Sequence, residues 1–178
     1  EDYAKRITDV ISEEAAKYNL PLPKLRIEPG RLISGPCGVA VGTVGAVKVG
    51  DKKKWVNLDL STNVLSWASI LDWYYHAVPV ENTEREATET VDIVGPLCNS
   101  DEIGKQRKMP PLVRGEHVAF LDAGGYVESQ AARYNAQCLP ATVLVFNELS
   151  EITTEREQLR DVSGRFRVPP RLLAQSFG

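Results

Sequence analysis

Three short segments carry side chains whose types and spacing suit chemistry. Glu28-Pro29-Gly30-Arg31 sets a carboxylate beside a guanidinium. Cys98 follows Gly95-Pro96-Leu97 and precedes Asn99-Ser100-Asp101, so its thiol is expected in a polar loop. Asp122-Ala123-Gly124-Gly125-Tyr126 joins two glycines, which let backbone N–H groups approach an anion, to a hydroxyl donor. Taken alone, each segment is also typical of ordinary structure: a charged turn, a packed cysteine and a glycine turn.

The first of these segments follows one helix and one strand. Apolar residues at three- and four-residue spacing predict an amphipathic helix from Tyr3 to Tyr18, ended by Pro21 and Pro23. The apolar run Leu25 to Ile27 then predicts a short buried strand. Helix, loop, strand and turn form the repeat of an α/β barrel, in which active sites lie at the carboxyl ends of the strands. Only one such repeat is present, and it places Glu28 and Arg31 at that end.

From Leu32 onward, alternating apolar residues and turn residues predict strands. We expect a mainly β body of six or seven short strands, arranged as a barrel or a sandwich. A charged stretch, 150–162, is predicted to be a helix. The clearest strands are expected at 39–49, 55–58, 90–97, 117–122 and 141–146.

Composition narrows the classes of partner. The 178 residues carry 21 basic and 24 acidic side chains, a net charge of −3, with no basic stripe for nucleic acid. No stretch approaches the roughly 20 apolar residues that span a bilayer. Three cysteines at wide spacing and two histidines indicate neither a metal site nor a disulfide framework. We expect a soluble, cytoplasmic protein.

The three segments, in this order, resemble motifs of the fold-type III pyridoxal-phosphate (PLP) decarboxylases. This group comprises diaminopimelate, ornithine and arginine decarboxylases, and the chain is most similar in motif to the diaminopimelate decarboxylase-like proteins. Tyr134-Asn135 and the run 140–145 extend the match, which covers Lys24 to Phe146 with a weaker echo at 167–169. The resemblance implies a Greek-key β-barrel or sandwich, the C-terminal domain of an alanine racemase-like enzyme, at 32–178. Residues 1–31 would be the last helix and strand of a PLP-binding TIM-type barrel.

The resemblance also implies roles for single residues. Glu28 matches the acid that pairs with the pyridine nitrogen of PLP, and so keeps the ring able to accept electrons. Arg31 and Tyr126 match positions that hold the cofactor phosphate or a substrate carboxylate. Cys98 matches a cysteine that crosses a homodimer interface and takes part in protonating the product carbon. Asn99, Asp101 and Tyr75 would then contact the amino-acid substrate.

Some positions depart from the pattern of the family. No arginine lies between Asp59 and His76, where diaminopimelate decarboxylases carry one for the distal carboxylate of their substrate. Asn99 stands where the family usually has an acid for a distal amine, and Tyr75 stands near the amine-binding aspartate of ornithine decarboxylases. The identity of the amino acid is therefore open, and the aromatic stretch 64–75 is expected to encode it. Its tryptophans, Trp67 and Trp73, are expected in the core or at an interface.

In this family the Schiff-base lysine, the ring-stacking histidine and the glycine-rich phosphate loop lie on the N-terminal barrel. None of the early lysines stands in a matching context, so the chain is expected to be inactive alone and to need the barrel portion of the same protein. Two alternatives stay open. One is a non-catalytic β-domain module for dimerisation or interaction, and the other is a relative of alanine racemase, although that group uses a tyrosine in place of the Gly-Pro-Leu-Cys loop.

Overall fold

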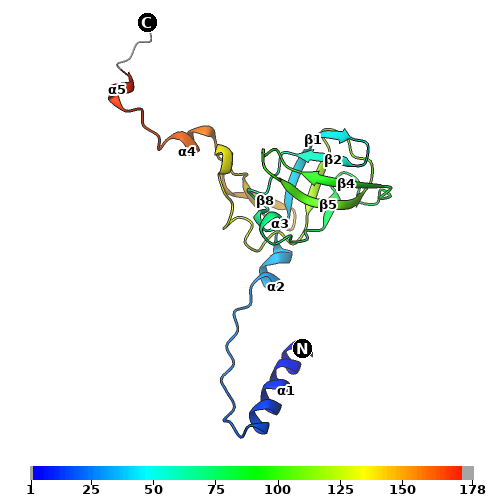
Figure 1. The fold of residues 1–178 in the computed structure, drawn as a ribbon, viewed down its shortest axis with the longest axis vertical. Helices are drawn as coiled ribbons and strands as arrows, with labels where there is room; N and C mark the ends of the chain where they lie inside the picture. Colours follow the sequence, from blue (N-terminus) through cyan, green and yellow to red (C-terminus); the bar gives the residue numbers. More distant parts are fainter. Residues whose placement is uncertain (1, 174–178) are drawn as a thin grey trace.

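The computed structural model describes residues 2–173. Helix α1 (Asp2–Lys17) has the predicted position, and its i,i+4 pair Lys5–Asp9 lies on the exposed surface. The apolar stripe of α1 does not pack on the rest of the chain, since only Ala15 is buried. Figure 1 shows α1 and the extended segment after it standing apart from the β body.

The segment Leu25 to Ile27, predicted to be a barrel strand, is not paired with another strand in this structure. The segment is extended but unpaired, and the Ile27 side chain is 70% exposed. A β-strand is stabilised by ladder hydrogen bonds to a neighbour, and within residues 2–173 no strand lies beside this segment.

The strands of the β body are β1 (Ala40–Val49), β2 (Lys54–Leu58), β3 (Ala77–Pro79), β4 (Glu89–Val94), β5 (Glu102–Met109), β6 (His117–Phe120), β7 (Thr142–Phe146) and β8 (Leu149–Thr154). The first six form one sheet in the order β3-β6-β1-β2-β4-β5, and β7 and β8 form a separate hairpin. All neighbours in the large sheet are antiparallel except β2 and β4. The two edge strands, β3 and β5, also contact each other, so the sheet nearly closes into a barrel. The mainly β, barrel-like architecture is thus confirmed. The helices after α1 are short: α2 (Arg31–Ser34), η1 (Gly35–Cys37), α3 (Ser66–Ile70), η2 (Tyr134–Ala136), α4 (Leu159–Ser163) and α5 (Pro170–Leu173).

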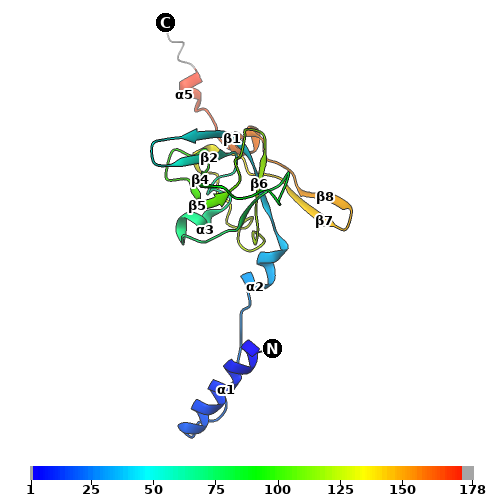
Figure 2. The same ribbon diagram turned by 90° about the vertical axis from the view of Figure 1, so that its right-hand side faces the viewer.

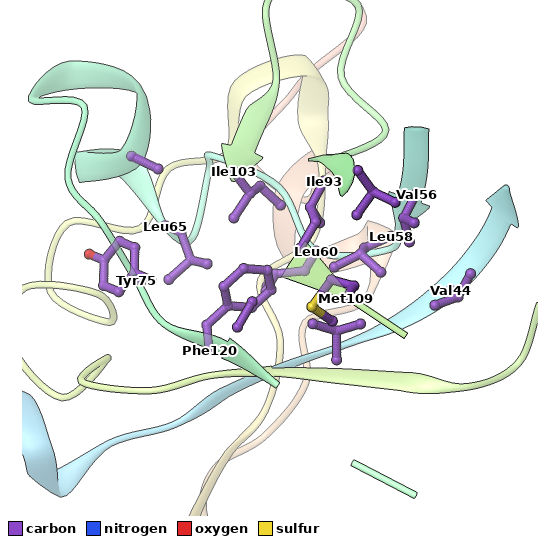
Figure 3. Close-up of a cluster of buried hydrophobic side chains, with 14 of the residues drawn as sticks. Val44, Val56, Leu58, Leu60, Leu65, Tyr75, Ile93, Ile103, Met109 and Phe120 are labelled. Atoms are coloured by element: carbon purple, nitrogen blue, oxygen red, sulfur yellow. The ribbon is translucent and has the colours of Figure 1, made fainter. Parts of the chain in front are cut away.

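A single apolar core fills the barrel (Figure 3). Phe120 from β6 and Ile93 from β4 are fully buried at its centre, with Ile103 and Met109 from β5. Each such side chain contributes about 1.5–3 kcal/mol when it leaves water. Buried residues alternate with less buried ones at Val56 and Leu58 of β2, whereas β4 and β6 each bury three residues in a row.

The helix predicted at 150–162 is wrong over its first half. Residues 149–154 form β8, and only 159–163 form a helix, α4. The two-residue turn Asn147-Glu148, with Asn147 in the left-handed region (φ 54°), returns the chain on itself so that Phe146 pairs with Leu149. The ladder to β7 therefore overrides the charged composition. Figure 2 shows this hairpin projecting from the side of the barrel.

Among the described residues, no helix combines the length and the apolar character that a bilayer crossing requires.

Candidate functional site

Close backbone packing brings the third chemical segment against the α2–η1 residues that follow the first. Ala123 N donates a hydrogen bond to Gly38 O at 2.9 Å, and Gly124 N donates to Gly35 O at 3.0 Å. A Cβ atom on Gly124 would overlap the Ser34 carbonyl oxygen and lie 2.8 Å from Gly38 N, so only glycine allows this approach. The N–H groups of Ala123 and Gly124 are consequently occupied. The sequence predicted that the glycines Gly124 and Gly125 leave N–H groups free for an anion, and this is wrong for Gly124, whose N–H is taken by Gly35 O.

The docked segment carries Arg31 into a group of aromatic rings. Its guanidinium carbon lies 4.2 Å from the ring centroids of both Trp67 and Trp73. The centroids of Tyr126 and Tyr75 are 5.6 Å and 6.0 Å away. Trp67 and Trp73 meet edge to face with planes 78° apart, and Tyr126 stacks on Trp67 at 4.8 Å. We call these four rings the aromatic cage.

The guanidinium has no hydrogen-bonding partner in the cage. Arg31 Nη1 and Nη2 are both buried, and neither donates a hydrogen bond to any residue in the range 2–173. An unpaired buried donor costs about 1–3 kcal/mol, and a charged one more. An oxyanion held by Nη1 and Nη2 would remove that cost through charge-assisted hydrogen bonds. The cage therefore fits the phosphate of PLP or a carboxylate.

Tyr126 and Gly30 form the open side of this site. Tyr126 is 42% exposed and has a left-handed backbone (φ 67°), a conformation that a tyrosine rarely adopts and that is concentrated at functional positions. A Cβ on Gly30 would lie 3.3 Å from the Tyr126 hydroxyl, so the Glu28–Arg31 turn runs directly past Tyr126. Glu28 itself is exposed, and it makes no hydrogen bond or ion pair with any other predicted site residue of the described chain.

Tyr75 contributes to the core more than to the surface. Its side chain is 1% exposed and belongs to the apolar cluster. Figure 3 shows its hydroxyl oxygen pointing away from the other core side chains. Sequence reasoning placed Tyr75 in the site and its neighbours Trp67 and Trp73 in the core or at an interface. Their position in the cage was missed, although the aromatic stretch 64–75 was the signal for it.

The second chemical segment is held by a buried carboxylate. Asp101 is 4% exposed, and its Oδ1 accepts hydrogen bonds from Thr62 N and Thr62 Oγ1, both at 2.7 Å. Its Oδ2 accepts from Leu97 N at 2.9 Å. Gly95 N donates to the Asp101 carbonyl oxygen at 2.8 Å. Asp101 therefore ties both ends of the loop that carries Cys98 to the 61–63 turn.

Cys98 is exposed at the tip of that loop, and Asn135 Nδ2 contacts its sulfur at 3.2 Å. Asn135 has φ 58°, which asparagine tolerates better than most residues. The backbone of Tyr134 is fixed by Asn63, whose Nδ2 donates to Tyr134 O at 2.9 Å. The 61–63 turn thus holds both the loop that carries Cys98, through Thr62, and the segment that carries Asn135, through Asn63. Sequence reasoning noted Tyr134-Asn135 as a motif and did not assign it a contact.

An ion pair between Arg133 and Glu157 holds the segment 133–139, which carries Asn135. Arg133 binds Glu157 through its Nε at 2.9 Å and through its Nη2. Leu139 N also donates to Glu157 at 3.0 Å. These hydrogen bonds, that of Arg133 first, lower the pKa of Glu157 from 4.5 to about 2. The segment 133–139 is therefore pinned on both sides of Asn135.

Apart from Glu28, the predicted site residues form two groups. Arg31, Tyr126 and Tyr75 meet in the aromatic cage, whereas Cys98, Asn99 and Asp101 share the 95–101 loop. Within residues 2–173, no hydrogen bond or aromatic contact joins Cys98 to Arg31. Asn99 is exposed and lines an open hollow beside its loop, together with Trp55 and Asn57.

Comparison with known proteins decides the family. Residues 8–124 match the family described as pyridoxal-dependent decarboxylase, C-terminal sheet domain. The chain belongs to this family. Membership confirms the resemblance drawn from the motifs, the mainly β sheet domain of a PLP-dependent decarboxylase, and PLP as the cofactor of the family.

Three individual relatives that match the chain are diaminopimelate decarboxylases. The chain is 29% identical over 174 residues to a diaminopimelate decarboxylase of Methanothermobacter thermautotrophicus, covering 97% of this chain and 40% of the relative. It is 34% identical over 161 residues to that of Staphylococcus aureus, covering 89% and 38%. The solved structure of a diaminopimelate decarboxylase from M. jannaschii matches with a TM-score of 0.80 and 31% identity, over 92% of this chain and 38% of that one. The chain thus spans about two fifths of these relatives.

Proposed function

We propose that this chain is the sheet-domain part of a PLP-dependent amino-acid α-decarboxylase of the diaminopimelate decarboxylase type. The observation that carries the proposal is the Arg31 guanidinium, buried among aromatic rings with two unpartnered nitrogens. Such a group is stable in a working protein when an anion completes it. Both the cofactor and the amino-acid substrate supply one.

The residues in and beside the aromatic cage have separate roles in binding. Arg31 Nη1 and Nη2 hold the cofactor phosphate or a substrate carboxylate, and the Tyr126 hydroxyl donates to the same oxyanion. Glu28 is exposed at the start of this turn, and its carboxylate would hold the pyridine nitrogen of PLP through a hydrogen bond. When bound, PLP accepts the electron pair that the departing CO₂ leaves behind. The aromatic rings exclude water around Arg31 and so strengthen its hold on the anion.

The 95–101 loop supplies the proton. The Cys98 thiol donates its proton from Sγ to the product carbon after CO₂ leaves, as a general acid. Asn135 orients the sulfur through its amide N–H. Asn99 faces the substrate from the exposed loop, and Asp101 holds the loop in place with both carboxylate oxygens, which is a role in positioning.

The proposed active site is completed by a second copy of the chain and by a barrel portion of the same protein. We place Cys98 in the active site of a second copy in a homodimer, and the Schiff-base lysine on a barrel portion of the same protein, so that the isolated chain is inactive. The division of the site residues into two separate groups supports sharing between subunits. The exposed apolar hairpin supports a covering partner, since Val145, Phe146 and Leu149 are 66–70% exposed. Cytoplasmic location stays a prediction.

A mixed-dimer experiment tests this proposal in the complete enzyme, assayed for CO₂ release from meso-diaminopimelate, lysine, ornithine and arginine. Cys98→Ala and Arg31→Ala homodimers should each be nearly inactive. Equilibrated together, they should recover about a quarter of the wild-type activity, because half of the dimers carry both variants and each of those has one intact site. No recovery would mean that the Arg31 and Cys98 of each active site come from the same subunit, which contradicts the shared site. No CO₂ from the wild type with any of the four amino acids would favour a non-catalytic module, and racemisation without CO₂ would favour the alanine racemase relative.

A further inference from the structure

The most unusual environment in the described chain is that of the Arg31 guanidinium. It lies in the corner formed by two indole rings, at equal distances of 4.2 Å from both centroids. Because the planes of Trp67 and Trp73 are 78° apart, the guanidinium carbon lies over two nearly perpendicular indole rings. A cation at this distance from an indole face is attracted by the quadrupole of the ring, and most strongly when water is excluded.

Each indole is itself held in place. Tyr126 stacks on Trp67 with the planes only 10° apart, and Trp67 Nε1 donates a hydrogen bond to Gln130. Trp73 N donates to Trp67 O at 3.0 Å, so the backbone fixes the second ring relative to the first. Held rings keep a long arginine side chain in a single rotamer, and this saves entropy when a ligand binds.

We propose that Trp67 and Trp73 are positioning residues that clamp Arg31 with Nη1 and Nη2 directed at an oxyanion. The inference rests on the proposed function, because the oxyanion is either the phosphate of PLP or a carboxylate of the amino acid. The clamp acts on the binding of that anion, and the chemical step at the product carbon is carried by other residues.

Paired substitutions separate the clamp from simple packing. Trp→Leu at 67 or at 73 keeps an apolar side chain and removes the ring, whereas Trp→Phe keeps a ring. At position 67 both Leu and Phe remove the hydrogen bond to Gln130, so a difference between these two variants comes from the ring and not from that bond. Tyr74→Leu is the control, because it removes a neighbouring cation–π pair, Arg107 over Tyr74 at 3.7 Å, outside the cage.

In the complete enzyme, each Leu variant should weaken one binding constant about tenfold, while kcat stays within about threefold. A rise in the Kd of PLP assigns the oxyanion to the cofactor phosphate, and a rise in KM assigns it to the amino acid. The Phe variants should recover to within about threefold of the wild type. The proposal is overturned when neither constant moves, when Phe is as damaging as Leu, or when Tyr74→Leu has the same effect.

A measurement on the 178-residue chain keeps the two proposals apart. Arg31→Met should change the tryptophan emission spectrum, because two of the three tryptophans contact the guanidinium, while Tyr74→Leu should leave it unchanged. An unchanged spectrum for Arg31→Met refutes the clamp. Absence of CO₂ release by the wild-type enzyme refutes the proposed activity and leaves the emission result as the independent test of the clamp.

Discussion

Asp101→Asn removes one charge from the buried support of the Cys98 loop and keeps the shape of the side chain. The carboxylate accepts three hydrogen bonds, two from Thr62 at 2.7 Å and one from Leu97 N at 2.9 Å. An asparagine can serve Thr62 with its one oxygen, but its NH₂ group then faces the Leu97 N–H. The buried Leu97 donor is left unpaired at about 1–3 kcal/mol, and each of the two remaining bonds weakens by about 1 kcal/mol. Asparagine is neutral, so the variant no longer bears the cost of burying a charge, and this gain offsets part of the lost hydrogen bonding. The net destabilisation is about 3 kcal/mol.

Urea unfolding of the 178-residue chain, followed by tryptophan fluorescence, measures the effect. With a slope of about 2 kcal/mol per molar, the midpoint should fall by about 1–2 M with the slope unchanged. Asp51→Asn is the matched control, since Asp51 is exposed in the turn between β1 and β2 and should shift stability by less than about 0.5 kcal/mol. Equal midpoints for the two variants would refute the assignment of Asp101 as the anchor of the loop.

Two further predictions concern the close approach at Gly124 and the ion pair between Arg133 and Glu157. Gly124→Ala should destabilise the chain by about 1–3 kcal/mol in the same urea assay, because backbone atoms occupy the space of the new Cβ. Gly45→Ala meets only Asn57 O at 3.8 Å and should be nearly neutral, so equal losses for the two would contradict the close approach. Glu157, with its pKa lowered from 4.5 to about 2, stabilises the fold above pH 4.5, and this contribution is lost as the pH falls from 4.5 toward 2. In an NMR titration, Arg133→Gln should raise the Glu157 midpoint toward 4.5, and an unmoved midpoint would show that Arg133 is not the cause.

The sequence by itself determined the features that depend on local pattern. The three- and four-residue spacing predicted α1, and alternation predicted the strands that became β1, β2, β4, β6 and β7 to within a few residues. Both patterns arise because side chains repeat along a helix or strand with a fixed period. The order of the three chemical segments was sufficient to identify the family.

Local pattern failed where pairing decides the structure. Charged residues such as Lys105 and Lys108 on the outer face of β5 hid a strand whose inner residues are buried. β5 is an edge strand with one ladder partner, β4, and exposed lysines are typical of such edges. Residues 149–154 likewise became a strand only because the turn at Asn147 pairs them with β7.

Only the tertiary structure placed the functional side chains relative to one another. Arg31 and Trp67 meet because the barrel brings α3 beside the α2–η1 segment, which docks where Gly124 has no side chain. Asp101 reaches Thr62 across the end of the sheet. Periodicity describes neighbours along one element, whereas these contacts join residues far apart in the chain, and their distances are set by strand order and by the closest approach that backbone atoms allow.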